Sequence, residues 1–391
     1  MSERRSGLHR RMLWPVYVPA LLLGVPAQAS FVLLPLYVLD LGGSAAAAAA
    51  VVGWRGIGMM AMDIPAGMLA ARLGQKAVMV AAGLLIGLAF VGYALSDSIA
   101  WFYVIAFVNG AGSSTFLLGR MAYVSAHLDP GERGRVIAMI AGSLRLAALL
   151  GPLAGGVLAQ QLGYSATFIV ASGSIVLGLF CILAFAEAEE RQGTALEWHR
   201  IPVLAFDHRH DFATYGVAAI TFMLMRAART VLIPLSGAAI GLDASTIGFV
   251  VAVSAAVDVV LFYPAGLVMD RYGRRATAVP SSVLFALVLG AVALADDYQT
   301  LLAVAIGAGL ANGLSTGIVM TLGTDLAPPL RRGEFLGLWR LLTDLGSAAG
   351  PMVVSSVVLV APLAAAALSV AALGACGSFV VYRYAAETLR H

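Results

Sequence analysis

The sequence contains 391 residues, of which 60% are hydrophobic and 12% are charged, and its mean hydropathy is +0.91. Ordinary soluble domains carry roughly a quarter of charged residues, so this composition excludes a water-soluble globular protein. The formal net charge of +3 is small and gives no reason to expect a nucleic-acid partner.

Apolar residues come in twelve blocks along the chain. Each block is long enough to cross a hydrocarbon core of roughly 30 Å as a helix. Lipid offers no partners to backbone N–H and C=O groups, and the unbroken apolar runs lack the alternation of a barrel strand. We therefore predict an all-α integral membrane protein. The predicted transmembrane spans are 12–39, 45–70, 77–95, 99–126, 136–160, 164–186, 212–240, 245–269, 276–295, 299–326, 336–360 and 362–384.

Arginine residues fall on alternate connections between these spans. Cytoplasmic connections retain an excess of positive charge, so we expect both termini in the cytoplasm and the chain in a bacterial inner membrane. We call this side the basic face; its connections carry Arg4, Arg5, Arg10, Arg11, Arg72, Lys76, Arg133, Arg135, Arg191, Arg200, Arg209, Arg271, Arg274, Arg275, Arg331, Arg332, Arg383 and Arg390. We call the opposite side the acidic face; the charged residues of its connections are Asp40, Asp97, Asp243, Asp296 and Asp297.

The chain also contains an internal repeat. Pro65-Ala-Gly67, followed by Arg72 and Gly74, recurs 199 residues later as Pro264-Ala-Gly266, followed by Arg271 and Gly273. Gly151-Pro152 recurs at the same offset as Gly350-Pro351. A constant offset over several spans predicts two related six-helix bundles, 1–186 and 212–391, joined by a polar cytoplasmic linker, 187–211. The linker segment 198–206 mixes aromatic residues with Arg and could lie in the membrane interface.

The loop after the eighth span resembles a motif of the major facilitator superfamily. The matching residues are Gly266, Asp270, Arg271, Gly273 and Arg274. The first-half copy has Gly67, Arg72 and Gly74, but Ala71 stands where the family usually has Asp, so an ion pair from that position is in doubt. The resemblance implies twelve transmembrane helices in two pseudo-symmetric six-helix bundles.

A second resemblance lies in the fifth and eleventh spans. Gly151, Pro152, Gly155 and Gly156, with Gly350 and Pro351 in the second half, resemble the motif associated with exporters of this superfamily. The Arg that the family places before Asn109-Gly110 is absent, and Ala106 stands there. These small residues could serve a conformational switch, because Gly-Pro loosens a helix and allows it to bend. They could equally serve close helix packing alone.

Ionisable residues within the spans are the most informative feature, because each costs at least ~2.5–3.5 kcal/mol at hydrocarbon depth. In the arrangement that the resemblance implies, span 2 faces span 11 and span 5 faces span 8. Asp63 could then meet Arg340, and Arg145 could meet Asp258. Arg340 and Asp344 share one helical face. The intramembrane ionisable residues are Arg55, Asp63, Arg120, Arg145, Arg226, Arg229, Asp258, Arg340 and Asp344.

We hypothesise that one of Asp63, Asp258 or Asp344 exchanges a proton during transport. Burial raises and a nearby Arg lowers the pKa of a carboxyl group, so rearranging such pairs can load and release a proton. Arg120, Arg145 and Arg340 are the accompanying coupling or gating candidates. Static ion pairs are the alternative. Candidates for the substrate cavity are Gln28, Arg55, Asn109, Arg226, Arg229 and Asn312, although interhelical hydrogen bonds also explain the three amides.

Taken together, these features predict a secondary active transporter that works by alternating access, with proton-coupled efflux of small amphiphilic compounds as the leading activity. The alternatives are a symporter or facilitator for a polar nutrient or metabolite, and a non-transporting membrane receptor. The sequence contains no Walker loop, hydrolase elbow or zinc-binding helix, so we expect neither an enzyme nor a cofactor. His208 and His210 lie in a polar cap rather than a metal site. We expect the monomer to be functional.

Overall fold

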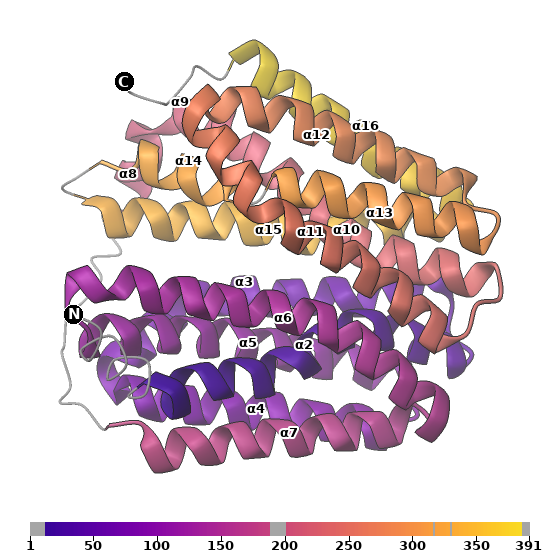
Figure 1. Ribbon diagram of the computed structural model, residues 1–391, viewed down its shortest axis with the longest axis horizontal. Helices are drawn as coiled ribbons and strands as arrows, with labels where there is room; N and C mark the ends of the chain where they lie inside the picture. The colour runs from indigo at the N-terminus through magenta and orange to yellow at the C-terminus, as the bar shows by residue number, and fades with distance from the viewer. Residues whose placement is uncertain (1–11, 188–200, 316, 329–330, 385–391) are drawn as a thin grey trace.

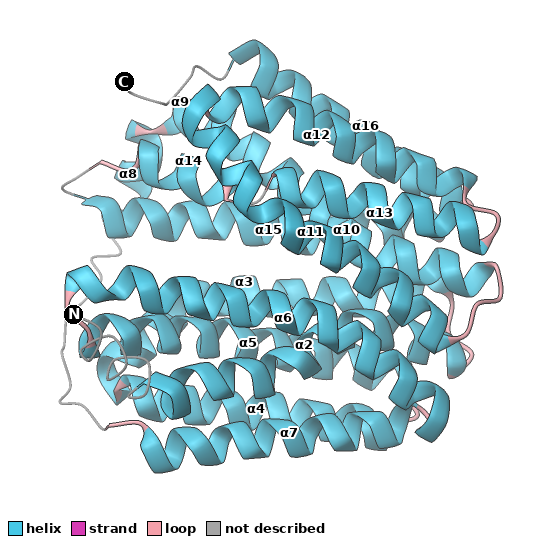
Figure 2. Ribbon diagram, viewed as in Figure 1, coloured by secondary structure: helices cyan, strands magenta, loops and turns pink. Residues whose placement is uncertain are grey.

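The computed structural model describes residues 12–187, 201–315, 317–328 and 331–384 (Figure 1). Within these ranges the secondary structure is helical and no strand occurs (Figure 2). Among the described residues, twelve helices are long and apolar enough to cross a membrane, which confirms the predicted fold class. Both termini and linker residues 188–200, which we predict to be cytoplasmic, lie outside the described residues.

The first bundle contains six long helices. They are α2 (Val18–Asp40), which continues the π-helical turn η1 (Leu13–Tyr17), α3 (Ala45–Leu73), α4 (Gln75–Leu95), α5 (Ile99–His127), α6 (Pro130–Leu162) and α7 (Tyr164–Phe185). Two short helices, α8 (Ile201–Asp207) and α9 (Arg209–Asp211), and the turn η3 (Phe212–Gly216) then lead into the second bundle.

The second bundle repeats this arrangement. Its helices are α10 (Val217–Ala239), α11 (Ala244–Tyr272), α12 (Arg274–Ala291) with the 3-10 turn η4 (Val292–Leu294), α13 (Tyr298–Leu314), α14 (Ile318–Leu326), α15 (Arg332–Val358) and α16 (Leu363–Tyr384).

Local chemistry fixes the helix ends. Ser44 and Asp243 begin α3 and α11, and each side chain accepts a hydrogen bond from a backbone N–H in the first turn. Gly74 and Gly273 end the same two helices with φ of 88° and 97°. A side chain is strained in that conformation, so glycine at both positions allows α4 and α12 to begin at once.

The tenth span differs from the prediction of one continuous helix over 299–326. The chain leaves helical geometry after Leu314, and Gly317 adopts a left-handed φ of 89° before α14 begins. Ser315 lies in the break, and its hydroxyl accepts a hydrogen bond from Arg226 Nη2 at 3.0 Å. A broken helix at membrane depth is tolerated where protein groups satisfy its freed backbone groups, and Arg226 Nη2 also donates to the Asn312 carbonyl at 3.5 Å.

The α8 segment packs on the protein. Leu204 is buried in a cluster with Phe335 and Trp339 of α15, while Val203 and Phe206 are exposed. The predicted interface segment is therefore docked against the second bundle through one face, and its first residues, 198–200, lie outside the described part of the chain.

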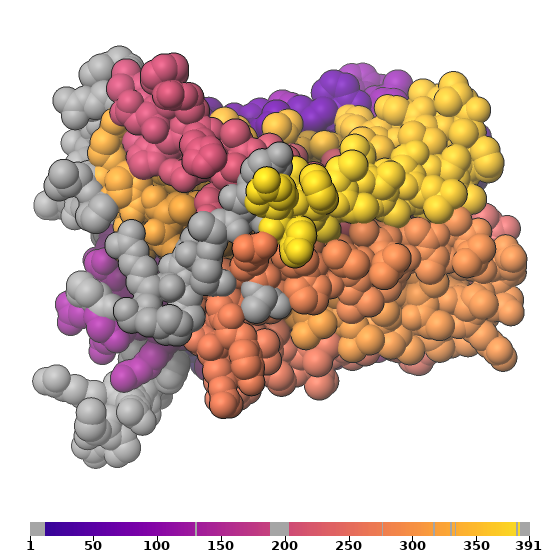
Figure 3. Space-filling model, turned by 90° about the horizontal axis from the view of Figure 1, so that it is seen from above, coloured from indigo at the N-terminus to yellow at the C-terminus, as the bar shows by residue number. Residues whose placement is uncertain are grey.

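Large apolar side chains cover the outside of the helices. In the space-filling view, α12 and α16 lie side by side on the outer face of the second bundle (Figure 3). Leu287, Leu368 and Phe379 on these helices are all more than half exposed. Exposed apolar surface on this scale suits contact with lipid tails rather than water.

Two helix pairs form the main contacts between the bundles. We call them the α3–α15 seam and the α6–α11 seam. Figure 1 shows α11 crossing toward α6, while α15 runs alongside the first bundle. These are the neighbours that the family arrangement implies for spans 2 and 11 and for spans 5 and 8.

Candidate functional site

An ion-pair triad lies on the α3–α15 seam. Arg340 Nε is 3.1 Å from Asp63 Oδ1 across the seam and 3.6 Å from Asp344 Oδ2, one turn further along α15. Ser114 of α5 donates a 2.5 Å hydrogen bond to Asp63 Oδ1 and accepts one from Arg340 Nη2 at 3.4 Å. One guanidinium thus serves two carboxyl groups, one from each bundle.

The two carboxyl groups of this triad are more buried than the guanidinium group. The side chains of Asp63 and Asp344 are 1% and 12% exposed, whereas that of Arg340 is 27% exposed. Asp63 Oδ2 and Asp344 Oδ2 are buried and have no hydrogen-bond partner among the described residues. The triad therefore holds acceptor capacity that a proton could satisfy.

The α6–α11 seam contains one carboxyl group, whereas the triad on the α3–α15 seam contains two. Arg145 Nη1 of α6 is 3.6 Å from Asp258 Oδ1 of α11, and its guanidinium lies 3.7 Å from the centre of the Phe262 ring. Asn312 donates a 2.7 Å hydrogen bond to Asp258 Oδ2. Both carboxylate oxygens of Asp258 thus have a partner among the described residues.

Two further arginines of α10 lie beside Asp258. Arg226 donates to Ser315 Oγ, and Arg229 Nη1 donates to the Ala308 carbonyl at 3.3 Å. Arg226 Nη2 also donates to the carbonyl of Asn312 at 3.5 Å, and the side chain of Asn312 binds Asp258. The second bundle thus gathers positive charge around a single carboxylate at the seam.

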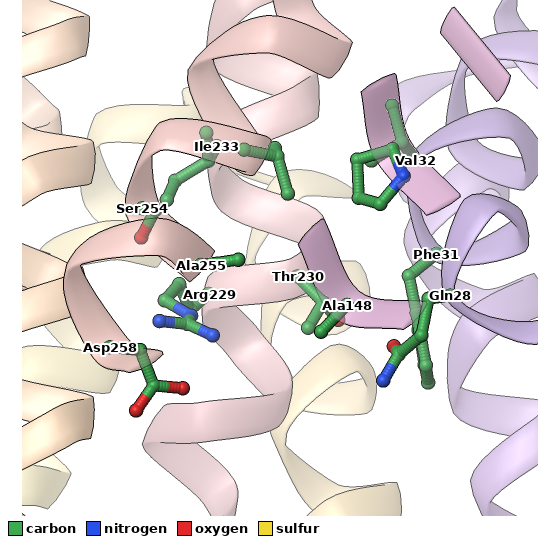
Figure 4. A pocket seen from close by; sticks show the side chains of 12 residues that line it. Gln28, Phe31, Val32, Ala148, Arg229, Thr230, Ile233, Ser254, Ala255 and Asp258 are labelled. Atoms are coloured by element: carbon green, nitrogen blue, oxygen red, sulfur yellow. The ribbon is translucent and has the colours of Figure 1, made fainter. Parts of the chain in front are cut away.

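A cavity of about 70 Å³ adjoins this cluster (Figure 4). Arg229, Asp258 and Ser254 approach it from the second bundle, and the Gln28 amide lies on the opposite wall. The remaining lining residues are Phe31, Val32, Ala148, Pro152, Thr230, Ile233, Val251 and Ala255.

The bundles are closely packed at the acidic end of both seams. A Cβ placed on Gly156 would lie 2.5 Å from the Ala244 carbonyl oxygen, and one on Gly53 would lie 2.8 Å from Met352 Cγ. Ser355 also donates a 2.9 Å hydrogen bond to the Ala46 carbonyl across the α3–α15 seam.

Packing loosens toward the basic end of the same helices. On Gly67, Gly142, Gly266 and Gly337 a Cβ would meet no neighbouring atom within 4 Å. The structure therefore places the tight contact between the bundles at the acidic face.

Comparison with known families identifies this arrangement. The family model described as Major Facilitator Superfamily matches residues 18–210 and 214–390. The chain belongs to the major facilitator superfamily. It is therefore an integral membrane transporter of that superfamily, which confirms the resemblance seen in the loop and Gly-Pro motifs.

Similar proteins carry several activities. The multidrug resistance protein MdtH of Enterobacter sp. (strain 638) is 25% identical in an alignment of 333 residues that covers 82% of this chain and 80% of that protein. The arabinose-proton symporter of Bacillus subtilis (strain 168) is 37% identical, but over 84 residues and 22% of this chain.

Solved structures show the same fold at low identity. A POT family transporter in complex with 5-aminolevulinic acid has a TM-score of 0.80 and 9% identity, over 94% of this chain and 95% of that one. The nucleoside transporter NupG has a TM-score of 0.78 and 13% identity, over 95% of this chain and 99% of that one.

The two copies of the superfamily loop motif differ in their contacts. In the second half, Arg274 Nε is 3.0 Å from Asp325 Oδ2 and its Nη1 is 3.8 Å from Asp270 Oδ1. Ala71 and Gln75 occupy the positions of Asp270 and Arg274 in the first half, so the same ion pairs cannot form there. Arg271 lies over the Tyr272 ring at 5.5 Å.

The Gly-Pro motif of the superfamily uses two faces of each helix. Gly151 and Gly155 pack on α2 within the first bundle, and Gly350 packs on α10 within the second. Pro152 and Gly156 instead face Gly248 of α11, on the other side of the seam. The motif thus joins the packing within a bundle to the contact between bundles.

Three sequence candidates do not line the cavity. Arg55 is 4% exposed with its guanidinium 4.2 Å from the centre of the Phe31 ring, and Asn109 is 1% exposed. Arg120 is 3% exposed and lies over Phe116. Side-chain atoms of all three lack a hydrogen-bond partner among the described residues. None of the three lines the cavity beside Asp258.

Sequence reasoning missed several polar side chains. Ser114 bridges Asp63 and Arg340, but nothing in its Gly- and Ser-rich surroundings separates it from a packing residue. Ser254 lines the cavity and stands 199 residues after Arg55, so the repeat offset could have drawn attention to it. Arg226 and Asn312, by contrast, were predicted near the substrate and do adjoin the Asp258 cluster.

Proposed function

We propose that this transporter is a proton-coupled exporter of small amphiphilic compounds in a bacterial inner membrane, with the basic face in the cytoplasm. The observation that carries the proposal is the triad in which Arg340 serves both Asp63 and Asp344. The similarity to MdtH, a protein named for multidrug resistance, supports the exporter activity.

The triad suits proton coupling because its charges do not balance. One guanidinium can compensate one carboxylate, and a second negative charge in a shielded site is costly. When two carboxyl groups interact, a proton belongs to the pair rather than to either residue. We therefore assign the exchangeable proton to the Asp63–Asp344 pair.

Separation of the bundles would change this proton affinity. Asp63 and Arg340 lie on opposite sides of the seam, whereas Asp344 stays beside Arg340 on α15. If α3 moves away from α15, Arg340 and Asp344 remain as a balanced pair, Asp63 becomes exposed to water as a carboxylate, and the shared proton passes to that water. Return of α3 restores two acids to one guanidinium, so the site binds a proton again.

Asp258 has a different role in this proposal. Its two oxygens already bind Arg145 and Asn312, so we assign it to a gate on the α6–α11 seam rather than to proton exchange. Because the bundles pack less tightly toward the basic face, the cavity would be reachable from the cytoplasm in this conformation.

The test uses the purified full chain in proteoliposomes with amphiphilic naphthalene compounds of each charge type. Asp344→Asn should abolish accumulation driven by a pH gradient but retain exchange of labelled for unlabelled substrate at equal pH, because exchange needs no net proton movement. Asp97→Asn, in an acidic-face connection, is the matched control and should behave as wild type. Driven transport that survives Asp344→Asn and Asp63→Asn would remove the pair from coupling.

Two cellular measurements test direction and orientation. Expression should lower the intracellular accumulation of the transported compound, whereas an importer would raise it. Tags placed at both termini should be protected from external protease in intact cells. Exposure of either tag would reverse the orientation assigned from the basic face.

A further inference from the structure

The positive charge around the cavity exceeds the negative charge. Arg145 pairs with Asp258, Arg226 contacts Asn312, which binds Asp258, and Arg229 lines the cavity together with Asp258. Intramembrane arginines are costly, and they occur where they pair with an acid or face a polar pathway. Asp258 can compensate one of the three, so the described residues leave a cationic excess at the seam.

The donors of Arg229 are free to serve a ligand. Of its five N–H groups, one donates to the Ala308 carbonyl, at 3.3 Å, among the contacts of the described residues. The oxygens of Asp258 meanwhile bind Arg145 and Asn312. Arg229 therefore presents a charged fork to the cavity while the neighbouring acid is occupied elsewhere (Figure 4).

The rest of the cavity is suited to an anion with an apolar body. Opposite Arg229, the first bundle contributes the Gln28 amide, which can donate to a second oxygen of the same group. Phe31, Ile233 and Val251 form apolar walls around these polar groups. A volume of about 70 Å³ on this scale holds roughly five water molecules, which matches a carboxylate or sulfonate headgroup.

We propose that this cavity binds the anionic headgroup of an amphiphilic organic anion, with Arg229 as its counter-ion and Gln28 as a second donor. The inference rests on the proposed function, since it names the substrate class of the exporter. An organic cation would meet the Arg229 guanidinium here, while Asp258, the lining carboxylate, is already paired with Arg145, so cation binding is disfavoured. Because Gln28 and Arg229 belong to opposite bundles, a bound anion also links the two bundles across the cavity.

The experiment measures binding by calorimetry with purified full-length protein in detergent, without any gradient. The three probes share one ring system: naphthalene-2-sulfonate, naphthalene-2-sulfonamide and the 2-naphthyltrimethylammonium cation. The sulfonate should bind roughly tenfold or more tightly than the other two, because hydrogen bonds to a charged partner are the strong ones. Equal affinities, or tightest binding of the cation, would overturn the proposal.

Variants locate the site. Arg229→Gln should weaken sulfonate binding by about tenfold and leave the sulfonamide unchanged, and Arg229→Lys should restore part of the loss. Gln28→Ala, from the opposite bundle, should weaken the sulfonate by a few fold. Arg209→Gln, on the basic face, is the matched control and should have no effect. Unchanged sulfonate affinity in Arg229→Gln would contradict the assignment, and unchanged sulfonamide binding shows that a variant is folded.

The outcomes separate this inference from the proposed function. Anion-selective binding without any pH-driven transport would refute proton-coupled export and leave the binding site standing. Proton-driven transport of the cationic probe, with no preference for the sulfonate, would refute the binding site alone.

Discussion

Replacing Gly156 by alanine should force the two bundles apart at the acidic face. The new Cβ would lie 2.5 Å from the Ala244 carbonyl oxygen and 3.2 Å from the Cα of Gly248. Contacts between a carbon and a carbonyl oxygen normally begin near 3.3 Å, so the α6–α11 seam must widen locally by about 0.8 Å. Both obstacles are backbone atoms of α11, which cannot rotate away.

The size of the effect follows from the cost of overpacking. An extra methyl group in a packed contact typically costs about 1–3 kcal/mol. A cost of about 2 kcal/mol falls on the state in which the acidic ends touch and not on the state in which they are apart. The population ratio of the two states should then shift by roughly 30-fold.

A cysteine introduced at a buried position can report this shift in population. Ser355 is 8% exposed at the acidic end of the other seam, and Ser355→Cys can be introduced after replacing Cys181 and Cys376 by alanine. In detergent, its reaction with a bulky maleimide should accelerate by about 10- to 30-fold in Gly156→Ala, in proportion to the open population.

Gly142→Ala is the matched control on the same helix. A Cβ there meets no neighbouring atom within 4 Å, and both substitutions gain the same helix propensity of about 1 kcal/mol. Equal labelling rates in the two variants would refute the inference that the acidic face is closed by backbone contact at Gly156.

Three further predictions concern stability in detergent, measured by thermal unfolding. Asp63→Arg should destabilise the protein by about 3 kcal/mol, and adding Arg340→Asp should recover at least half of that loss; no recovery would argue against a direct pair. Gly273→Ala should cost about 1–2 kcal/mol because φ is 97°, whereas Gly266→Ala on the same helix should be neutral or stabilising; equal midpoints would contradict the backbone argument. Hydrogen bonds from the first turn of α11 lower the pKa of Asp243, so its stabilising effect is present above about pH 4 and lost as the pH falls further. Asp243→Asn should remove this loss, and an unchanged pH profile would contradict it.

Part of the site could be predicted because the family resemblance implied which helices are neighbours. Asp63 and Arg340 are far apart in sequence, yet the family arrangement implied that spans 2 and 11 face each other, and the two side chains are 3.1 Å apart. The i,i+4 spacing likewise placed Asp344 beside Arg340. Their transport roles stay predictions.

The positions of Arg55 and Asn109 could not be read in the same way. Depth along a helix follows from counting residues, but the direction of a side chain depends on how that helix is rotated within its bundle. Arg55 contacts the ring of Phe31, a lining residue, without lining the cavity itself, and Asn109 is buried elsewhere in the first bundle. The break at Ser315 was missed for a related reason, since the group that satisfies it, Arg226, comes from another helix.

The sequence by itself determined the solvent, the number of spans and the duplicated architecture. These follow from local quantities, namely the length and polarity of each segment and the constant offset between the halves, which act before any helix meets another. Only the tertiary structure decided that two carboxyl groups share Arg340, that Arg229 faces a cavity and that the bundles touch at the acidic face. The physical reason is that each of these features depends on how separate helices rotate and dock against one another. Hydropathy and residue spacing carry no information on that arrangement.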